Sequence, residues 1–181
     1  MRVILISWEE LTDDIITLAR RIQRPRFDVM VAIARGGLVA ARILSDLIGI
    51  RKLASLTISY YEKVGVRGAK PRIVSDVGMN LEGLRVLLVD DVADTGHTLR
   101  IALQHLVERG AESVTTCTVY LKPWCKYKPD YHAKMVDRWI VFPYEQAETL
   151  SELLGDGYTE EELLKAGFNP KIIGYLRERE H

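Results

Sequence analysis

The chain has 181 residues, 48% of them hydrophobic, and its 25 lysines and arginines are balanced by 25 acidic residues. This length suits one domain with a buried core, and the zero formal net charge gives no general attraction to nucleic acid or to anionic membranes. No apolar run reaches the ~20 residues of a membrane-spanning helix, and Glu9 and Glu10 come too early for a signal peptide, so we expect a cytoplasmic protein without membrane or nucleic-acid partners.

Hydrophobic periodicity predicts alternating helices and strands in the first third of the chain. Ser7 and Glu10 form a capping box at the start of one helix, and Gly49 is a suitable end for another. In chain order we expect a helix with its apolar face at Leu11, Ile15, Leu18, Ala19 and Ile22, a strand at 28–34, a helix carrying Ala40, Ile43, Leu44, Leu47 and Ile48, and a strand at 53–61.

Residues 62–80 are long for a connector in a compact domain. They contain Gly65, Gly68, Pro71 and Gly78, and their first half is basic. Connectors of this length are usually functional lids or solvated loops. Both interpretations stay open, and the position after a strand favours a lid.

The alternation continues through the second half. We expect a strand at 85–90, a helix with its apolar stripe at Leu99, Ala102, Leu103, Leu106 and Val107, and a strand at 114–121. This order is typical of an α/β fold with a mainly parallel sheet flanked by helices. Ligands in such folds bind at the carboxyl ends of the strands, here just after residues 34, 61, 90 and 121.

The C-terminal region is predicted to form short helices. One covers about 147–154, a capping box at Thr159 and Glu162 begins the next, and Asn169 with Pro170 opens the last. Two short helices joined by a tight turn could be mistaken for a DNA-reading motif. From residue 145 to the end, however, nine acidic residues face four lysines and arginines, a balance that phosphate would disfavour. We expect a packing or subunit-contact role.

The candidate chemistry lies in residues 86–98, where an apolar strand runs into two carboxylates and then a Gly/Thr turn before a helix. Residues 93–98 would present successive N–H groups and hydroxyls to an anion such as a phosphate monoester. Asp90 and Asp91 suit sugar hydroxyls or Mg²⁺, and Asp94 could face the reacting centre. A tight turn with an aspartate cap would explain one carboxylate, but not three in five positions.

Residues 89–98, Val-Asp-Asp-Val-Ala-Asp-Thr-Gly-His-Thr, resemble the phosphoribosyl pyrophosphate (PRPP) motif of type I phosphoribosyltransferases, and within them the xanthine–guanine and hypoxanthine–guanine branch. The resemblance implies the type I fold with a small hood at about 122–145, a domain over 1–145, and a C-terminal helical extension at 146–181. It implies Mg²⁺ held by Asp90 and Asp91, and Asp94 as the catalytic acceptor of the base N7 proton. The PRPP phosphate and ribose would contact Asp90, Asp91, Val92, Ala93, Asp94, Thr95, Gly96, His97 and Thr98.

Two further segments match the family in order. Residues 34–38, Ala-Arg-Gly-Gly-Leu, resemble its pyrophosphate loop, whose Arg–Gly step is often a cis peptide. The resemblance places pyrophosphate at Arg35 and Gly36 and leaves open whether the bond between them is cis. Ser59 and Tyr60 resemble the root of the family's flexible lid, which closes over PRPP and excludes water.

The base site is implied by a fourth match. Lys122 would donate to the purine 6-oxo group, Trp139 would stack on the ring, and Ile140 would contact the base through its backbone. A lysine ammonium cannot accept a hydrogen bond, so Lys122 favours a 6-oxopurine over adenine. Outside this context, a core position would be the preferred interpretation of Trp139. The aromatics and lysines between 124 and 134 suit single-stranded nucleic acid or, in better agreement with the family, a hood beside the base.

The predicted function is therefore transfer of the phosphoribosyl group of PRPP to N9 of guanine, hypoxanthine or xanthine in purine salvage, by a homodimer or homotetramer. The alternatives are a PRPP-sensing regulatory protein and a phosphoribosyltransferase for another nucleobase. His97 stands where related purine enzymes usually have Gly or Lys, and Tyr144-Glu145 where the xanthine–guanine branch usually has Trp-Asp. The preferred 6-oxopurine thus stays open.

Overall fold

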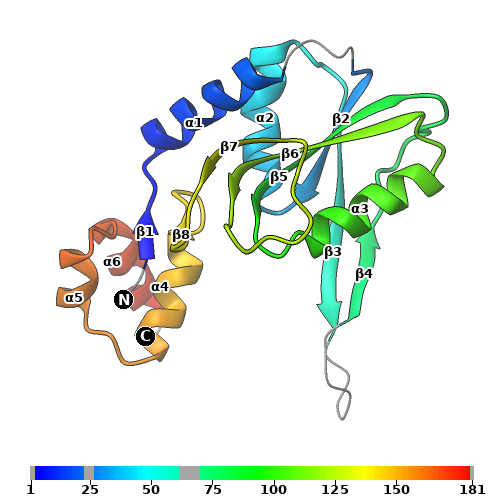
Figure 1. Ribbon diagram of the computed structural model, residues 1–181. Coiled ribbons are helices and arrows are strands. Elements are labelled where there is room, and N and C mark those ends of the chain that lie inside the picture. The colour runs from blue at the N-terminus through cyan, green and yellow to red at the C-terminus, as the bar shows by residue number, and fades with distance from the viewer. Residues whose placement is uncertain (1–2, 23–26, 62–69, 180–181) are drawn as a thin grey trace. The chain divides into compact units, whose positions relative to one another are not determined.

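The computed structural model describes residues 3–22, 27–61 and 70–179 (Figure 1). The chain divides into two compact units, one formed by Thr12–Asp137 and the other by Met1–Leu11 together with Arg138–His181. The predicted boundary after residue 145 lies inside the second of these units, and a domain over 1–145 with an extension at 146–181 stays a prediction.

The Thr12–Asp137 unit is built on a six-stranded sheet. Its strand order is β4-β3-β2-β5-β6-β7, and every neighbouring pair is parallel except β3 with β4. The predicted α/β fold with a mainly parallel sheet is confirmed. The strands are β2 (Val29–Ala34), β3 (Leu53–Tyr61), β4 (Lys70–Ser75), β5 (Arg85–Ala93), β6 (Ser113–Leu121) and β7 (Tyr131–Met135).

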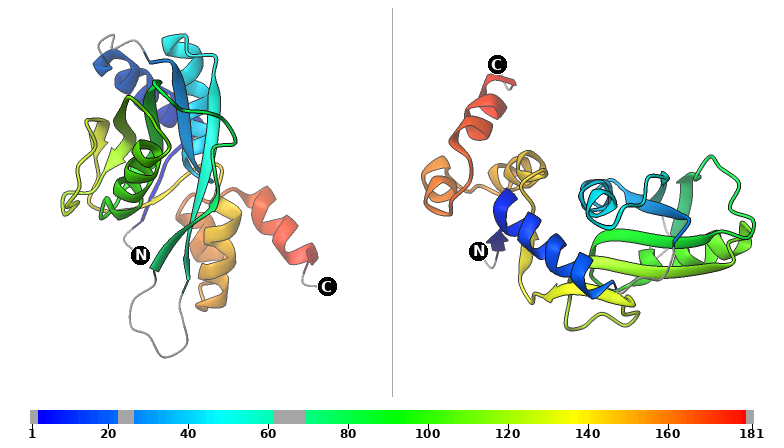
Figure 2. Two further views of the ribbon diagram at one scale, coloured as in Figure 1. Left: turned by 90° about the vertical axis from the view of Figure 1, so that its right-hand side faces the viewer. Right: turned by 90° about the horizontal axis from the view of Figure 1, so that it is seen from above.

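Helices cover both faces of this sheet. Figure 2 shows α2 (Gly37–Ile48) and α3 (His97–Glu108) on opposite sides of it. Side chains alternate between faces along a strand, so Val29, Val31 and Ile33 of β2 share one face and pack with α3. Burial on both faces explains why the central strands read as continuous apolar runs. The core on the α3 side consists of Val29, Val31, Ile33, Leu56, Val77, Leu81, Val86, Leu88, Leu99, Ala102 and Leu106.

Two strand predictions need correction. The strand expected at 85–90 continues to Ala93, because β5 keeps its parallel pairing with β6 as far as Ala93 opposite Leu121. Part of the segment read as a loop, Lys70–Ser75, is strand β4, which pairs antiparallel with the end of β3. Residues 62–69, the centre of the predicted lid, lie outside the described residues.

The second unit contains a two-stranded parallel sheet and three helices. β1 (Val3–Leu5) pairs with β8 (Trp139–Val141), and α4 (Gln146–Gly155), α5 (Glu160–Lys165) and α6 (Pro170–Arg179) follow. The helices bury Leu150, Leu163, Phe168 and Ile173 around Val141, which gives the C-terminal region a packing role.

The helix signals in the sequence are confirmed. Ser7 and Glu10 exchange both capping-box hydrogen bonds at the start of α1 (Trp8–Arg21), and Thr159 and Glu162 do the same at α5. Gly49 ends α2 with a left-handed φ of 76°. None of the helices in the described parts of the chain is both long and apolar enough to cross a membrane.

Candidate active site

The loop after β2 and the acidic end of β5 lie against each other. The two strands are neighbours in the sheet, with Ala32 opposite Val89, so their carboxyl ends come together. A Cβ added to Gly36 would overlap the carboxylate of Asp91, and one added to Gly37 would lie 2.7 Å from the Val89 carbonyl oxygen. The absence of a side chain at both positions therefore lets the predicted pyrophosphate loop lie directly against the end of β5, where Asp90 and Asp91 are the predicted metal ligands.

The cis peptide bond of this loop joins Ala34 to Arg35, one residue earlier than the Arg35–Gly36 bond. Gly36 already has helical dihedral angles, with φ −59° and ψ −44°, and the Leu38 N–H donates to the Arg35 carbonyl at 3.2 Å. The Arg35–Gly36 peptide thus belongs to the turn that begins α2, and the cis bond lies one position before the step that the resemblance singled out.

Asp90 and Asp91 form a compact pair of carboxylates. The Asp91 N–H donates to Asp90 Oδ1 at 3.0 Å, the Val92 N–H donates to Asp91 Oδ1 at 2.7 Å, and Asp91 is only 9% exposed. Burial and the neighbouring Asp91 charge raise the pKa of Asp90 well above its ordinary value. A bound cation would relieve the repulsion between the two carboxylates, which adds to the effect of burial on this pKa.

Residues 93–98, which include the loop between β5 and α3, form a cradle at the N-terminal end of the helix. Gly96 has φ 80°, the Arg100 N–H donates to the Gly96 carbonyl at 3.0 Å, and the His97 N–H donates to Thr95 Oγ1 at 3.3 Å. A cavity of about 300 Å³ lies here, lined by Asp90 and residues 92–99. The structure thus brings together the residues predicted for the sugar phosphate, at a helix N-terminus that suits an anion.

The segment after β6 holds this cradle from the side. The Lys122 N–H donates to the Ala93 carbonyl at 3.0 Å, and the Lys126 N–H donates to the Thr95 carbonyl at 3.1 Å. A Cβ at Gly96 would overlap the Tyr127 carbonyl oxygen, so glycine is required there by space as well as by φ. The cradle is fixed by backbone contacts at both ends.

Lys122 lies at the carboxyl end of β6, as predicted, and is 6% exposed. Burial lowers the pKa of its ammonium, and the charges of Asp94 and Asp137 act in the opposite direction. Lys122 is therefore a buried cation near two carboxylates rather than a surface charge.

Trp124 is the residue that sequence reasoning missed. Its indole Nε1–H donates to Asp94 Oδ1 at 2.7 Å, and the Lys122 Nζ lies 5.7 Å from the centroid of its ring. In sequence it was one of several aromatics in an irregular segment, and no local pattern could pair it with an aspartate 30 positions away. It also helps to line a second cavity of about 680 Å³, together with Thr95, His97, Arg100, Lys126 and Tyr127.

The remaining predicted residues lie on other strands. Ser59 and Tyr60 lie on β3, opposite Arg72 and Pro71 of β4, at the last pairs before residue 62. Trp139 and Ile140 lie on β8 of the second unit, where Trp139 is 64% exposed and Ile140 is buried. The exposure of Trp139 argues against the alternative that it fills a core.

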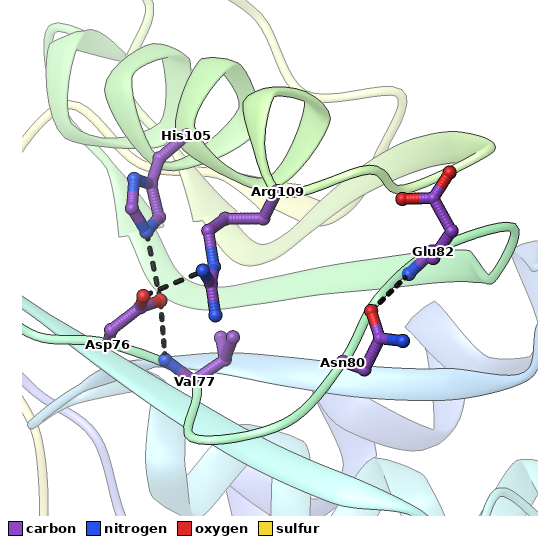
Figure 3. A network of polar contacts seen from close by, with 6 residues as sticks. All are labelled: Asp76, Val77, Asn80, Glu82, His105 and Arg109. Atoms are coloured by element: carbon purple, nitrogen blue, oxygen red, sulfur yellow. Dashed lines mark hydrogen bonds and ion pairs between the residues drawn. The ribbon is translucent and has the colours of Figure 1, made fainter.

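An aspartate holds the chain after β4 to helix α3 (Figure 3). Asp76 Oδ1 lies 2.9 Å from His105 Nε2 and accepts from the Val77 N–H at 2.7 Å, while Asp76 Oδ2 lies 3.2 Å from Arg109 Nε. The hydrogen bond from His105 is the largest of the effects that lower the pKa of Asp76. The contacts of Asp76 with His105 and Arg109 thus connect the C-terminal side of the predicted lid to helix α3, which begins at the cradle.

The chain is similar over most of its length to one family of known proteins. The model of the phosphoribosyl transferase domain matches residues 7–147. The xanthine–guanine phosphoribosyltransferase of Idiomarina loihiensis is 34% identical over 147 residues, covering 80% of this chain and 88% of that protein. The enzyme of the same name from Chromohalobacter salexigens is 33% identical over 153 residues, covering 83% and 89%.

Solved structures show the same similarity. The purine phosphoribosyltransferase from Pyrococcus horikoshii Ot3 has a TM-score of 0.73 and 33% identity, covering 80% of this chain and 94% of that one. A hypothetical protein from Neisseria gonorrhoeae, crystallised with bound ppGpp, has a TM-score of 0.72 and 25% identity, covering 87% and 98%.

Proposed function

Because the chain belongs to the phosphoribosyltransferase family, we propose that it is a purine salvage enzyme that transfers the phosphoribosyl group of PRPP to a 6-oxopurine. One observation carries this proposal. Gly36 of the predicted pyrophosphate loop lies against the carboxylate of Asp91, and the cradle at the N-terminal end of α3 follows Asp91 directly in the chain. The neighbouring carboxyl ends of β2 and β5 thereby offer groups for a 5′-phosphate, a ribose diol and a diphosphate.

In this reaction the bond between N9 of the base and C1′ of the ribose forms as the bond from C1′ to the diphosphate oxygen breaks. The pyrophosphate leaves with that electron pair, and the N7 proton of the base moves to the carboxylate of Asp94. The cradle amides fix the 5′-phosphate, and Arg35 with the backbone after it receives the diphosphate. Most of the rate enhancement comes from positioning and charge stabilisation.

Asp90 and Asp91 are suited to hold Mg²⁺. The described residues contain no group of three or more potential protein ligands, so two carboxylates would bind the ion together with water and substrate oxygens, as is usual for Mg²⁺. Burial, followed by the charge of Asp91, raises the pKa of Asp90, and a cation bound at the pair would favour the ionised form of both carboxylates. When bound, the ion would neutralise charge on the diphosphate and ribose oxygens.

Specificity for the base rests on Lys122. Its buried ammonium can donate to a 6-oxo group but has no lone pair for the 6-amino group of adenine. The roles of Trp139 and Ile140 in base binding, those of Ser59 and Tyr60 at the lid, and an oligomeric assembly stay predictions from the family. A cytoplasmic location stays a prediction from the sequence.

Incubation with PRPP, Mg²⁺ and a panel of guanine, hypoxanthine, xanthine, adenine and uracil tests the proposal. We expect nucleotide and pyrophosphate from the 6-oxopurines, and none when EDTA is present or PRPP is omitted. Product only from adenine or uracil would assign the enzyme to another nucleobase. PRPP binding in calorimetry without any product would instead favour a PRPP sensor.

A further inference from the structure

We propose that Trp124 is a positioning residue, which holds the carboxylate of Asp94 in the orientation that receives the N7 proton of the base. The catalytic part of this inference rests on the proposed function, in which Asp94 is the proton acceptor. The contact between the two side chains stands independently of it.

The contact itself is short and charge-assisted. The indole Nε1–H of Trp124 donates to Asp94 Oδ1 at 2.7 Å, within the range for an N–H donor on an ionised carboxylate. An indole N–H can only donate, so this group cannot compete for the transferred proton. Because Oδ1 already accepts this hydrogen bond, uptake of the proton is assigned to Oδ2.

The backbone places Trp124 beside Asp94. Residues 122–127 run along residues 93–96, and the Lys122 and Lys126 N–H groups donate to the Ala93 and Thr95 carbonyls on either side of the pair. The Cys125 N–H also donates to the Lys122 carbonyl at 3.0 Å, which closes a turn around Trp124. These backbone hydrogen bonds fix the position of Trp124 next to Asp94, although the residue is 54% exposed.

Trp124 also links Asp94 to the residue that recognises the base. The Lys122 ammonium lies 5.7 Å from the centroid of the indole ring, within cation–π distance. One ring thus contacts the predicted proton acceptor through its N–H edge and the predicted 6-oxo donor through its π system. A half-exposed tryptophan that served only packing would not need either contact.

The kinetic test uses Trp124→Phe, which keeps an aromatic ring for Lys122 but removes the N–H donor. We expect kcat to fall about tenfold, the order expected for loss of a hydrogen bond to a charged group, while KM for PRPP is unchanged. Trp8→Phe is the matched control, because Trp8 is similarly exposed in the other unit, and it should leave kcat unchanged. In an Asp94→Asn background, Trp124→Phe should have no further effect, because its action passes through the carboxylate.

A spectroscopic test needs no activity. The three tryptophans give three indole N–H resonances, and the one missing in Trp124→Phe belongs to Trp124. This resonance should shift in Asp94→Asn, where a neutral amide replaces the charged acceptor. An unshifted resonance would show that the contact is absent in solution and would overturn the inference.

The two tests separate the possible failures. A shifted resonance with normal kcat in Trp124→Phe would overturn the positioning role and leave the proposed function intact. A wild-type protein that makes no nucleotide would overturn the proposed function, and the positioning role with it, while the resonance shift would still report the contact.

Discussion

The backbone of Gly36 packs against the carboxylate of Asp91, and this contact joins the turn that begins α2 to the acidic end of β5. Gly36 has φ −59°, an angle that alanine adopts as readily as glycine. Glycine is therefore required here by the space that Asp91 occupies, and the contact can be tested without introducing backbone strain.

Gly36→Ala should raise KM for PRPP by an order of magnitude or more. The new methyl group would displace either Asp91 or the turn, and displacements of about 1 Å in a binding site can cost ~10²-fold. Gly155→Ala in α4 is the control, since a Cβ there meets nothing within 4 Å, and it should leave KM unchanged. Unchanged KM in Gly36→Ala would mean that the two loops can separate without loss.

Asp94→Asn should lower turnover at least ~10²-fold, the lower end of the range for general acid–base catalysis. Asparagine keeps the shape of the side chain but cannot take up the N7 proton. PRPP affinity, measured by calorimetry, should stay within a few-fold of wild type, because the cradle amides are untouched. Near-normal turnover would remove Asp94 from the proton-transfer role.

Local signals in the sequence predicted most of the fold. Ser7 with Glu10, Thr159 with Glu162, and Gly49 each act within a few residues, and the structure confirms the helix start or end that each predicted. The strand ending at 90 was drawn too short because polar Asp90 and Asp91 interrupt the apolar run. Only the parallel pairing with β6, a long-range effect, carries β5 to Ala93.

The site was predictable where its residues are consecutive. Residues 90–98 could be proposed as a site because strand, carboxylates, turn and helix follow one another in the chain. Trp124 and the His105 partner of Asp76 were missed because each contact joins residues about 30 positions apart, at 2.7 Å and 2.9 Å, through the fold rather than the sequence. The short strands β1, β7 and β8 escaped because three to five residues are too few to show a period.

The lowered pKa of Lys122 predicts a pH effect on base binding. Since burial shifts the pKa down, the ammonium loses its proton at a lower pH than an ordinary lysine, and KM for guanine should rise on the alkaline side accordingly. Below the pKa of Lys122, Lys122→Ala should raise KM for guanine more than KM for PRPP, and this difference should shrink as the pH rises and the wild-type ammonium loses its proton. Lys128→Ala, a neighbouring exposed lysine, should change neither, and equal losses for both substrates in Lys122→Ala would make Lys122 a structural residue.

The hydrogen bonds of Asp76 to His105 and Val77, with the ion pair to Arg109, should contribute to stability. Asp76→Asn should lower the free energy of unfolding by about 1 kcal/mol, a value that allows for the partial exposure of the carboxylate. Asp46→Asn is the control, because its pair with Arg42 is exposed on one helix and should contribute less than the contacts of Asp76.

The pH dependence of this difference follows from the pKa of Asp76, which the fold lowers below its ordinary value of 3.8. A carboxylate with a depressed folded pKa stabilises fully above the unfolded pKa and loses this contribution as the pH falls through the folded pKa. Urea unfolding should therefore show the whole difference between wild type and Asp76→Asn near pH 6, and a shrinking difference below about pH 4. A difference that stays constant down to pH 3 would show that the charge of Asp76 is not what holds the segment after β4 to α3.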